Sequence, residues 1–199
     1  VVGGINNRAT GNCSTVGGGE VNSACAIVST IAGGSSNTIC SNAQLSTIGG
    51  GQSNTHSNGY YSVIAGGYSN LSTGYFNTVG GGRNNTASGN NSTVSGSCNT
   101  ASGIGATISG GQSNTASGGC SFIGGGISNL SSGAYAVIGG GNANCAINGG
   151  DTIAGGINSR TGGGYATVSG GYNNTATGYM SSIGGGCINL SNGQASTVG

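Results

Sequence analysis

An isoleucine or valine returns about every fifteen residues along the 199-residue chain, and this period constrains the fold more than any other feature. The intervals between these anchor residues are 14, 15, 17, 16, 15, 15 and 14 residues, followed by six intervals of 15. A fixed short period is typical of proteins in which one supersecondary unit is repeated and stacked. We therefore expect a single repeat array over residues 1–199, with about 13 coils. The anchors are Val2, Val16, Ile31, Ile48, Ile64, Val79, Val94, Ile108, Ile123, Ile138, Ile153, Val168, Ile183 and Val198.

The residues around each anchor alternate in character, as in a β-strand. In one clear repeat, Ala166 and Val168 are expected to point one way, and Tyr165 and Thr167 the other. No segment keeps the 3.6-residue apolar period of a helix. A second short strand follows in each repeat, as Asn-Thr-Ala-Ser or Asn-Leu-Ser-Ser. The pattern predicts an all-β fold, a parallel β-roll or β-solenoid with 15-residue coils.

Glycine and asparagine recur at fixed distances from the anchor. The second residue after the anchor is glycine in all thirteen complete repeats, which predicts a positive φ or a close backbone approach there. Asparagine stands six residues after the anchor in ten of thirteen repeats, and one residue earlier at Asn7, Asn99 and Asn158. We expect these amides to lie in turns and to bond to one another as a ladder between coils.

The composition excludes several classes of partner. Net charge is +1, from Glu20, Asp151 and three arginines, so the chain has no charged patch for nucleic acid. No apolar run approaches the length of about 18 residues that a membrane helix needs, so we expect no direct membrane insertion of this segment. The sequence starts and stops inside repeats, and we expect it to be an excerpt of a longer fibrous protein.

The apolar content of one repeat is small. Burying one valine or isoleucine contributes about 1.5–3 kcal/mol, whereas ordering each residue costs about 1–2 kcal/mol of backbone entropy. Association with identical chains would bury further surface. We therefore expect a homo-oligomer, and a trimer in particular.

A stripe of large residues and threonines is the candidate interaction surface. The residue three positions before the anchor is often large, and the residue directly before the anchor is usually threonine. We expect this stripe to pack against a neighbouring chain; the alternatives are that it binds a sugar, another protein or ice. Its members are Tyr61, Phe76, Tyr135, Tyr165, Thr78, Thr107 and Thr167.

Seven cysteines are present, with no CxxC pair. Cys25 and Cys40 each lie nine residues after an anchor in consecutive repeats, so stacked coils would bring them within the Cα separation of a disulfide. Either a disulfide or a ladder of free thiols fits this spacing. For the other five cysteines we expect buried free thiols.

No residue pattern predicts catalysis, a cofactor or a metal. His56 is the only histidine, and we expect it at a surface turn. The two acids, Glu20 and Asp151, are far apart in sequence and cannot act as a carboxylate pair in a linear array. Metal-binding clusters of cysteine and histidine are also missing from the sequence. We therefore expect no enzymatic activity.

The stretches ATISGGQSNTASGG (106–119) and ATVSGGYNNTATGY (166–179) resemble the head repeats of YadA-type trimeric autotransporter adhesins and related repeats in viral and phage fibres. The resemblance extends over the whole chain. It implies a left-handed parallel β-roll with three chains around a common axis.

Together these features favour a non-enzymatic structural or adhesive fibre segment, a rigid trimeric shaft or head on a cell or virion surface. Its partners would be further copies of itself and a host-surface protein or glycan. The alternatives are a self-assembling extracellular filament or sheath subunit, and an ice- or glycan-binding β-solenoid.

Overall fold

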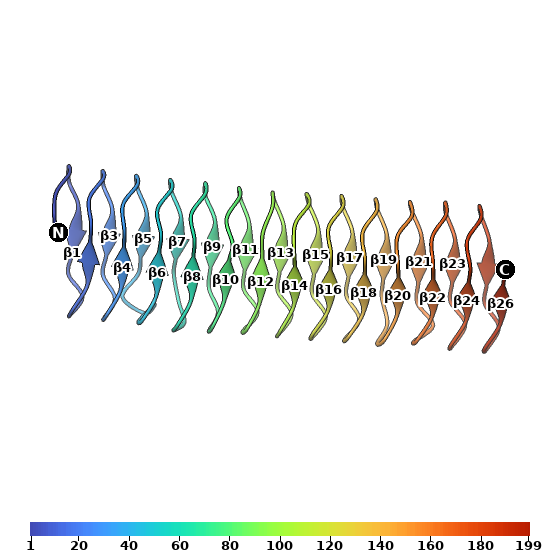
Figure 1. Cartoon of the computed structure of the whole chain (residues 1–199). Coiled ribbons are helices and arrows are strands. Elements are labelled where there is room, and N and C mark those ends of the chain that lie inside the picture. Colours follow the sequence, from blue (N-terminus) through green and yellow to red (C-terminus); the bar gives the residue numbers. More distant parts are fainter. The chain divides into compact units, whose positions relative to one another are not determined.

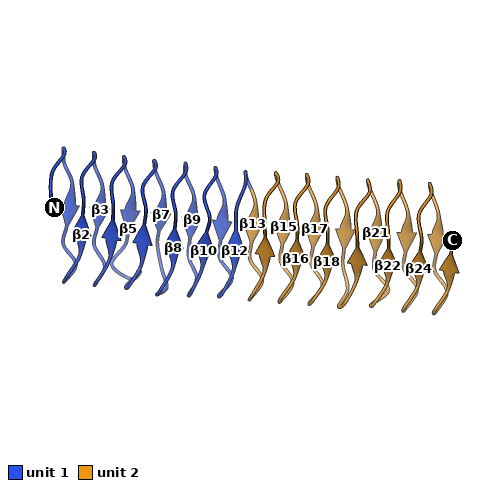
Figure 2. Ribbon diagram, in the orientation of Figure 1, with its two compact units in different colours: residues 1–98 blue, residues 99–199 orange.

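The computed structural model describes residues 1–199 and contains 26 two-residue β-strands and no helix (Figure 1). The chain divides into two compact units, Val1–Cys98 and Asn99–Gly199 (Figure 2). The strands of the first unit are β1 (Arg8–Ala9), β2 (Thr15–Val16), β3 (Ser23–Ala24), β4 (Thr30–Ile31), β5 (Thr38–Ile39), β6 (Thr47–Ile48), β7 (Thr55–His56), β8 (Val63–Ile64), β9 (Leu71–Ser72), β10 (Thr78–Val79), β11 (Thr86–Ala87) and β12 (Thr93–Val94).

The second unit has fourteen strands of the same kind. They are β13 (Thr100–Ala101), β14 (Thr107–Ile108), β15 (Thr115–Ala116), β16 (Phe122–Ile123), β17 (Leu130–Ser131), β18 (Val137–Ile138), β19 (Cys145–Ala146), β20 (Thr152–Ile153), β21 (Arg160–Thr161), β22 (Thr167–Val168), β23 (Thr175–Ala176), β24 (Ser182–Ile183), β25 (Leu190–Ser191) and β26 (Thr197–Val198).

Within each unit the odd-numbered strands form one parallel sheet and the even-numbered strands form another (Figure 1). Neighbouring strands pair residue for residue at the repeat distance, as β14 does with β16 through Thr107↔Phe122 and Ile108↔Ile123. One coil is therefore an even strand, a turn, an odd strand and a second turn. The predicted all-β parallel solenoid with coils of about fifteen residues is confirmed. The left-handed sense of the coils, the trimer and the single array over the whole chain stay predictions.

The two turns of a coil differ and are named here. The glycine turn joins an even strand to the next odd strand, as residues 169–174 do between β22 and β23. The aromatic turn joins an odd strand to the next even strand, as residues 177–181 do between β23 and β24. The repeats of 17 and 16 residues keep the strand register, with Thr30↔Thr47 and Thr47↔Val63. Their extra residues are accommodated in the aromatic turn.

The core is a narrow layer between the two sheets. Ala166 and Val168 are fully buried while Thr167 between them is partly exposed, so the alternation predicted from the sequence is confirmed for these three residues. Complete burial of each isoleucine or valine contributes about 1.5–3 kcal/mol. The opposite sheet supplies a smaller inward residue, which is alanine in most coils, such as Ala116 and Ala176.

Asparagine side chains form the predicted ladder. Asn129 shows the pattern: its Nδ2 donates to Gly125 O at 3.0 Å and to Gly141 O at 3.1 Å. Its Oδ1 accepts the backbone N–H of Asn144 at 3.0 Å. Each amide thus satisfies two glycine carbonyls and one backbone donor of the next coil, where a buried unpaired group would cost about 1–3 kcal/mol.

Two of the three displaced asparagines join this ladder. Asn7 and Asn99 do so because their glycine turns are one residue shorter, and Asn99 Oδ1 accepts the N–H of Asn114 at 2.8 Å. Asn158 does not, since Ser159 occupies the buried rung. Ser159 Oγ accepts the N–H of Asn174 at 3.4 Å, longer than the asparagine rungs. The expectation of an equivalent asparagine at 158 is therefore wrong.

The glycine requirement falls one residue later than predicted in most coils. At Gly125 and Gly140, two residues after their anchors, an added Cβ would meet no heavy atom within 4 Å. At Gly126 φ is +88°, and an added Cβ would overlap the carbonyl oxygen of Gly141. The left-handed conformation and the close approach both belong to this third position.

Candidate interaction surface

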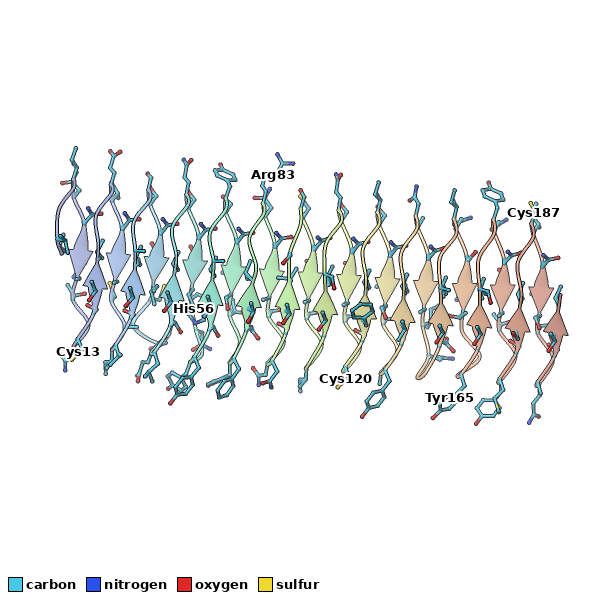
Figure 3. The ribbon with its side chains drawn as sticks, in the orientation of Figure 1. Cys13, His56, Arg83, Cys120, Tyr165 and Cys187 are labelled. Atoms are coloured by element: carbon cyan, nitrogen blue, oxygen red, sulfur yellow. The ribbon has the colours of Figure 1, made fainter.

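The large residues that precede each even strand lie on the aromatic turn and not on the sheet face. Tyr61, Phe76, Tyr135 and Tyr165 have φ between +54° and +59°, in the left-handed region. This conformation is a genuine outlier for a bulky residue. It ends the alternation of the strand, so the prediction that these residues share a strand face with the threonines is wrong. Their side chains extend outward from the edge of the coil, as Tyr165 does in Figure 3.

Neighbouring aromatic turns stack their rings. Tyr61 and Phe76 are nearly parallel, with ring centroids 5.2 Å apart and an interplanar angle of 9°. Beside them, Tyr60 and Tyr75 meet edge to face at 5.3 Å. Aromatic pairs of this geometry contribute about 0.5–1.5 kcal/mol beyond burial. All four rings remain exposed, so the edge of the first unit carries an ordered aromatic patch.

The threonines of the predicted stripe lie on the outer face of the even-numbered sheets. Thr78, in β10, pairs with Thr93, and Thr167, in β22, pairs with Thr152. Thr107, in β14, pairs with Phe122. The residue after each anchor on this face is glycine, alanine or serine, so this column is flat, whereas the threonine column also contains the exposed Val63 and Phe122. Its two columns contain no charged residue, whereas Arg8 and Arg160 lie on odd-numbered strands.

Within each unit the aromatic turns adjoin the even-numbered sheet face, and we call the two together the threonine–aromatic surface of that unit. Across the two units it comprises the seven stripe residues, with Tyr60 and Tyr75 at its edge. All ten aromatic residues of the chain are exposed: seven lie on aromatic turns, Phe122 lies in β16, and Tyr68 and Tyr172 lie on glycine turns outside this surface. Exposed apolar groups in such number mark interaction sites more often than chance surface.

His56 is buried, which contradicts its expected place at a surface turn. It lies in β7 with 1% of its surface exposed, in the inward column that holds Ile39 in the preceding coil (Figure 3). Its Nδ1 lies 3.0 Å from the carbonyl oxygen of Ser72 and donates to it, while Nε2 has no hydrogen-bond partner. Burial lowers the pKa of His56, and the hydrogen bond to Ser72 opposes this effect.

Asp151 belongs to a second polar column that sequence reasoning missed. It is fully buried two residues before its anchor, and its carboxylate accepts the N–H groups of Asn148 and Ala166, each at 3.0 Å. In another coil Ser62 Oγ accepts the N–H of Asn77 at 3.0 Å in the same way. The consistently small or polar residue at this place in each repeat was the available signal.

The cysteines occupy three kinds of site. Cys25 and Cys40 are partly exposed free thiols in neighbouring coils. Cys145, in β19, is partly exposed, and burial raises the pKa of its thiol. The remaining four are exposed in turns, so the expectation of buried thiols is wrong for them. Cys13 and Cys120 lie on aromatic turns and Cys187 on a glycine turn (Figure 3). Cys98 lies on the glycine turn between β12 and β13.

No protein-family model matches the chain, and a search of curated proteins finds no similar sequence. The structure contains no pocket and no cluster of three metal-ligating side chains. None of its secondary-structure elements is an apolar helix of membrane-spanning length.

Proposed function

We propose that this chain is a non-enzymatic segment of an extracellular fibre, on a cell or a virion, built from three copies that associate through the threonine–aromatic surface. The fold suits such a role because each coil repeats the same hydrogen bonds and the same small core. Stability then accumulates by adding coils, and length is gained without a larger core.

The observation that carries the proposal is the choice of residue at the left-handed position of the aromatic turn. Gly105 and Gly150 occupy this position in two coils, with φ of +69° and +72°. Glycine therefore fits the turn and avoids the strain that a bulky residue suffers there. Folding alone does not call for Tyr61, Phe76, Tyr135 or Tyr165. A partner surface that buries these side chains gives a reason for their presence.

The sheet face supports the same conclusion. An uncharged face of threonine, glycine, alanine and serine, with Val63, Phe122 and Val137 in its threonine column, can approach an identical face without burying an unpaired charge. The aromatic residues beside it have the amphipathic character that is enriched at protein interfaces. A second role, in which exposed aromatic patches at the fibre surface contact a host protein or glycan, uses the same residues after assembly.

The test is the mass of the assembly in solution, measured by sedimentation equilibrium. The natural chain should form a stable trimer. The double variant Tyr61→Gly, Phe76→Gly should keep its cooperative melting, because glycine occupies equivalent turns, yet its Kd for association should rise about tenfold or more. Tyr68→Ser is the matched control: it removes an exposed tyrosine from a glycine turn, where Ser35 is an equivalent residue.

A natural chain that stays monomeric and folded would overturn the proposal. So would a double variant that assembles as tightly as the control. Polymers that lengthen with concentration would instead favour the filament alternative.

A further inference from the structure

Cys25 and Cys40 are neighbours across two coils. They directly follow β3 and β5, which pair in parallel through Ser23↔Thr38 and Ala24↔Ile39. The Cys25 N–H continues this register by donating to Ile39 O at 2.9 Å. Because Ala24 and Ile39 point into the core, the two thiols project from the same outer face. Adjacent parallel strands are about 4.8 Å apart, and disulfides span Cα separations of about 4.4–6.8 Å.

The two thiols have different surroundings. Ser23 Oγ lies 3.2 Å from Cys25 Sγ. Hydrogen bonds from Ser23 and Thr10, with the charge of Arg8, lower the pKa of the Cys25 thiol despite its partial burial. Burial and the neighbouring Cys25 raise the pKa of the Cys40 thiol. Because the thiolate is the reactive form, Cys25 is the better nucleophile of the pair at neutral pH.

We propose that Cys25 and Cys40 form a peroxide-reactive dithiol, in which Cys25 is oxidised first and Cys40 then closes a disulfide between the two coils. Both thiols are partly exposed and free, so a small oxidant reaches them. This modification site does not depend on the fibre role. The two thiols are the first residues of their aromatic turns, on the face that continues the odd-numbered sheet, and not at the left-handed position that carries the large side chains.

The chemistry has two steps. The Cys25 thiolate attacks one oxygen of hydrogen peroxide: an S–O bond forms, the O–O bond breaks, and the departing hydroxide takes a proton from solvent to become water. The product is a sulfenic acid on Cys25. The Cys40 thiol then loses its proton and attacks the Cys25 sulfur. An S–S bond forms, the S–O bond breaks, and the hydroxide that leaves takes up a proton as a second water. The thiols are oxidised and the peroxide is reduced.

The other cysteines lack this arrangement. Cys145 pairs in register with Leu130 and Arg160, so no thiol adjoins it in its column. The four exposed cysteines lie in turns, without a cysteine at the matching place of the next coil. They supply the background reactivity against which the pair is measured.

The experiment uses the full chain with the five other cysteines replaced by serine, treated with hydrogen peroxide and analysed by intact mass. We expect the mass of a single chain, not of a disulfide-linked dimer, to fall by two hydrogen atoms after oxidation and to return to its original value with a reductant. In this background, Cys40→Ser should accumulate a sulfenic acid on Cys25, detected with dimedone. Cys25→Ser should react at least about tenfold more slowly.

Two further readouts separate the proposal from general thiol reactivity. Thr10→Val with Ser23→Ala should raise the pKa of the Cys25 thiol, measured by thiolate absorbance, and slow oxidation without changing the fold. The oxidised chain should also melt at a higher temperature, by on the order of 10 °C, because the disulfide closes a loop between coils. Absence of an intrachain disulfide would overturn the proposal. Faster oxidation of Cys40 than of Cys25 would overturn the assignment of the nucleophile.

Discussion

The two turns of the coil differ in how much variation in sequence and length they accept. Two positions of the glycine turn are nearly invariant: eleven coils place a left-handed glycine three residues after the anchor, and the ladder amide follows in almost every coil. The aromatic turn varies in composition and length, and both long repeats are extended there. Both turns bond to the next coil, through Asn129 in the glycine turn and Asp151 in the aromatic turn. The aromatic turn differs in having an outward position, three residues before the anchor, that is free to carry large side chains.

The physical origin of this difference is the surroundings of the two positions. At the left-handed glycine of the glycine turn a side chain would overlap the backbone of the next coil, and the amide of Asn129 is bonded on three sides. In the aromatic turn the large side chain points away from the protein. Tyr135, for example, has 70% of its surface exposed. Substitutions are therefore expected to cost stability in the first turn and association in the second.

The largest expected loss of stability comes from one of two adjacent glycines in the same glycine turn. Gly126→Ala should destabilise the second unit by about 3–5 kcal/mol, because its φ of +88° disfavours alanine and the added Cβ overlaps Gly141 O. Gly125→Ala should change the free energy of unfolding by less than about 1 kcal/mol, since no atom lies within 4 Å of the added carbon. Urea denaturation followed by circular dichroism measures both. Equal costs would show that the two glycines are not distinguished as described.

The next effect concerns the ladder. Asn129→Ala should cost about 3 kcal/mol, because Gly125 O and the N–H of Asn144 lose their side-chain partner and Gly141 O keeps only the N–H of Ile127. The same denaturation experiment applies. Ser128→Ala, one residue earlier and exposed, is the control and should be nearly silent. If Asn129→Ala lowers the free energy of unfolding by less than about 1 kcal/mol, the asparagine ladder is not a main source of stability between coils.

The third effect is a pH dependence of stability that arises from His56, whose coil has a lengthened aromatic turn. Because burial lowers the pKa of His56 in the folded chain, its stabilising contribution is complete above the unfolded pKa of about 6.5 and declines as pH falls below it. The decline should approach at most about 1.4 kcal/mol per pH unit. Melting curves between pH 8 and pH 5 should show it in the natural chain and not in His56→Ile, which copies Ile39. A pH dependence that survives this substitution would assign it to another group.

The smallest expected effect is an increase in stability. Ser159→Asn should stabilise the second unit by about 1 kcal/mol, because the amide would donate to two glycine carbonyls and shorten the weak 3.4 Å rung to Asn174. Ser128→Asn introduces the same residue outside the ladder and should leave the melting temperature unchanged. A destabilising Ser159→Asn would mean that this coil cannot adopt the standard glycine turn.

Sequence alone identified the features that repeat in every coil. The anchor period gave the strands, their burial and their register, and the spacing of asparagine predicted the ladder. It could not decide which of two adjacent glycines is left-handed, because both columns read as glycine. His56 was misplaced although counting eight residues from Ile48 puts it in the column of Ala24 and Ile39. Left-handed tyrosine and phenylalanine were not foreseen, since intrinsic preference argues against them.

The most direct test of the account is a cryo-electron microscopy map of the native assembly, because the aromatic turns are proposed to lie where the copies meet. We predict three chains related by threefold symmetry, with Tyr61, Phe76, Tyr135 and Tyr165 buried between copies and the glycine turns facing solvent. Copies that meet through their glycine turns, or single chains with their aromatic turns exposed, would contradict it.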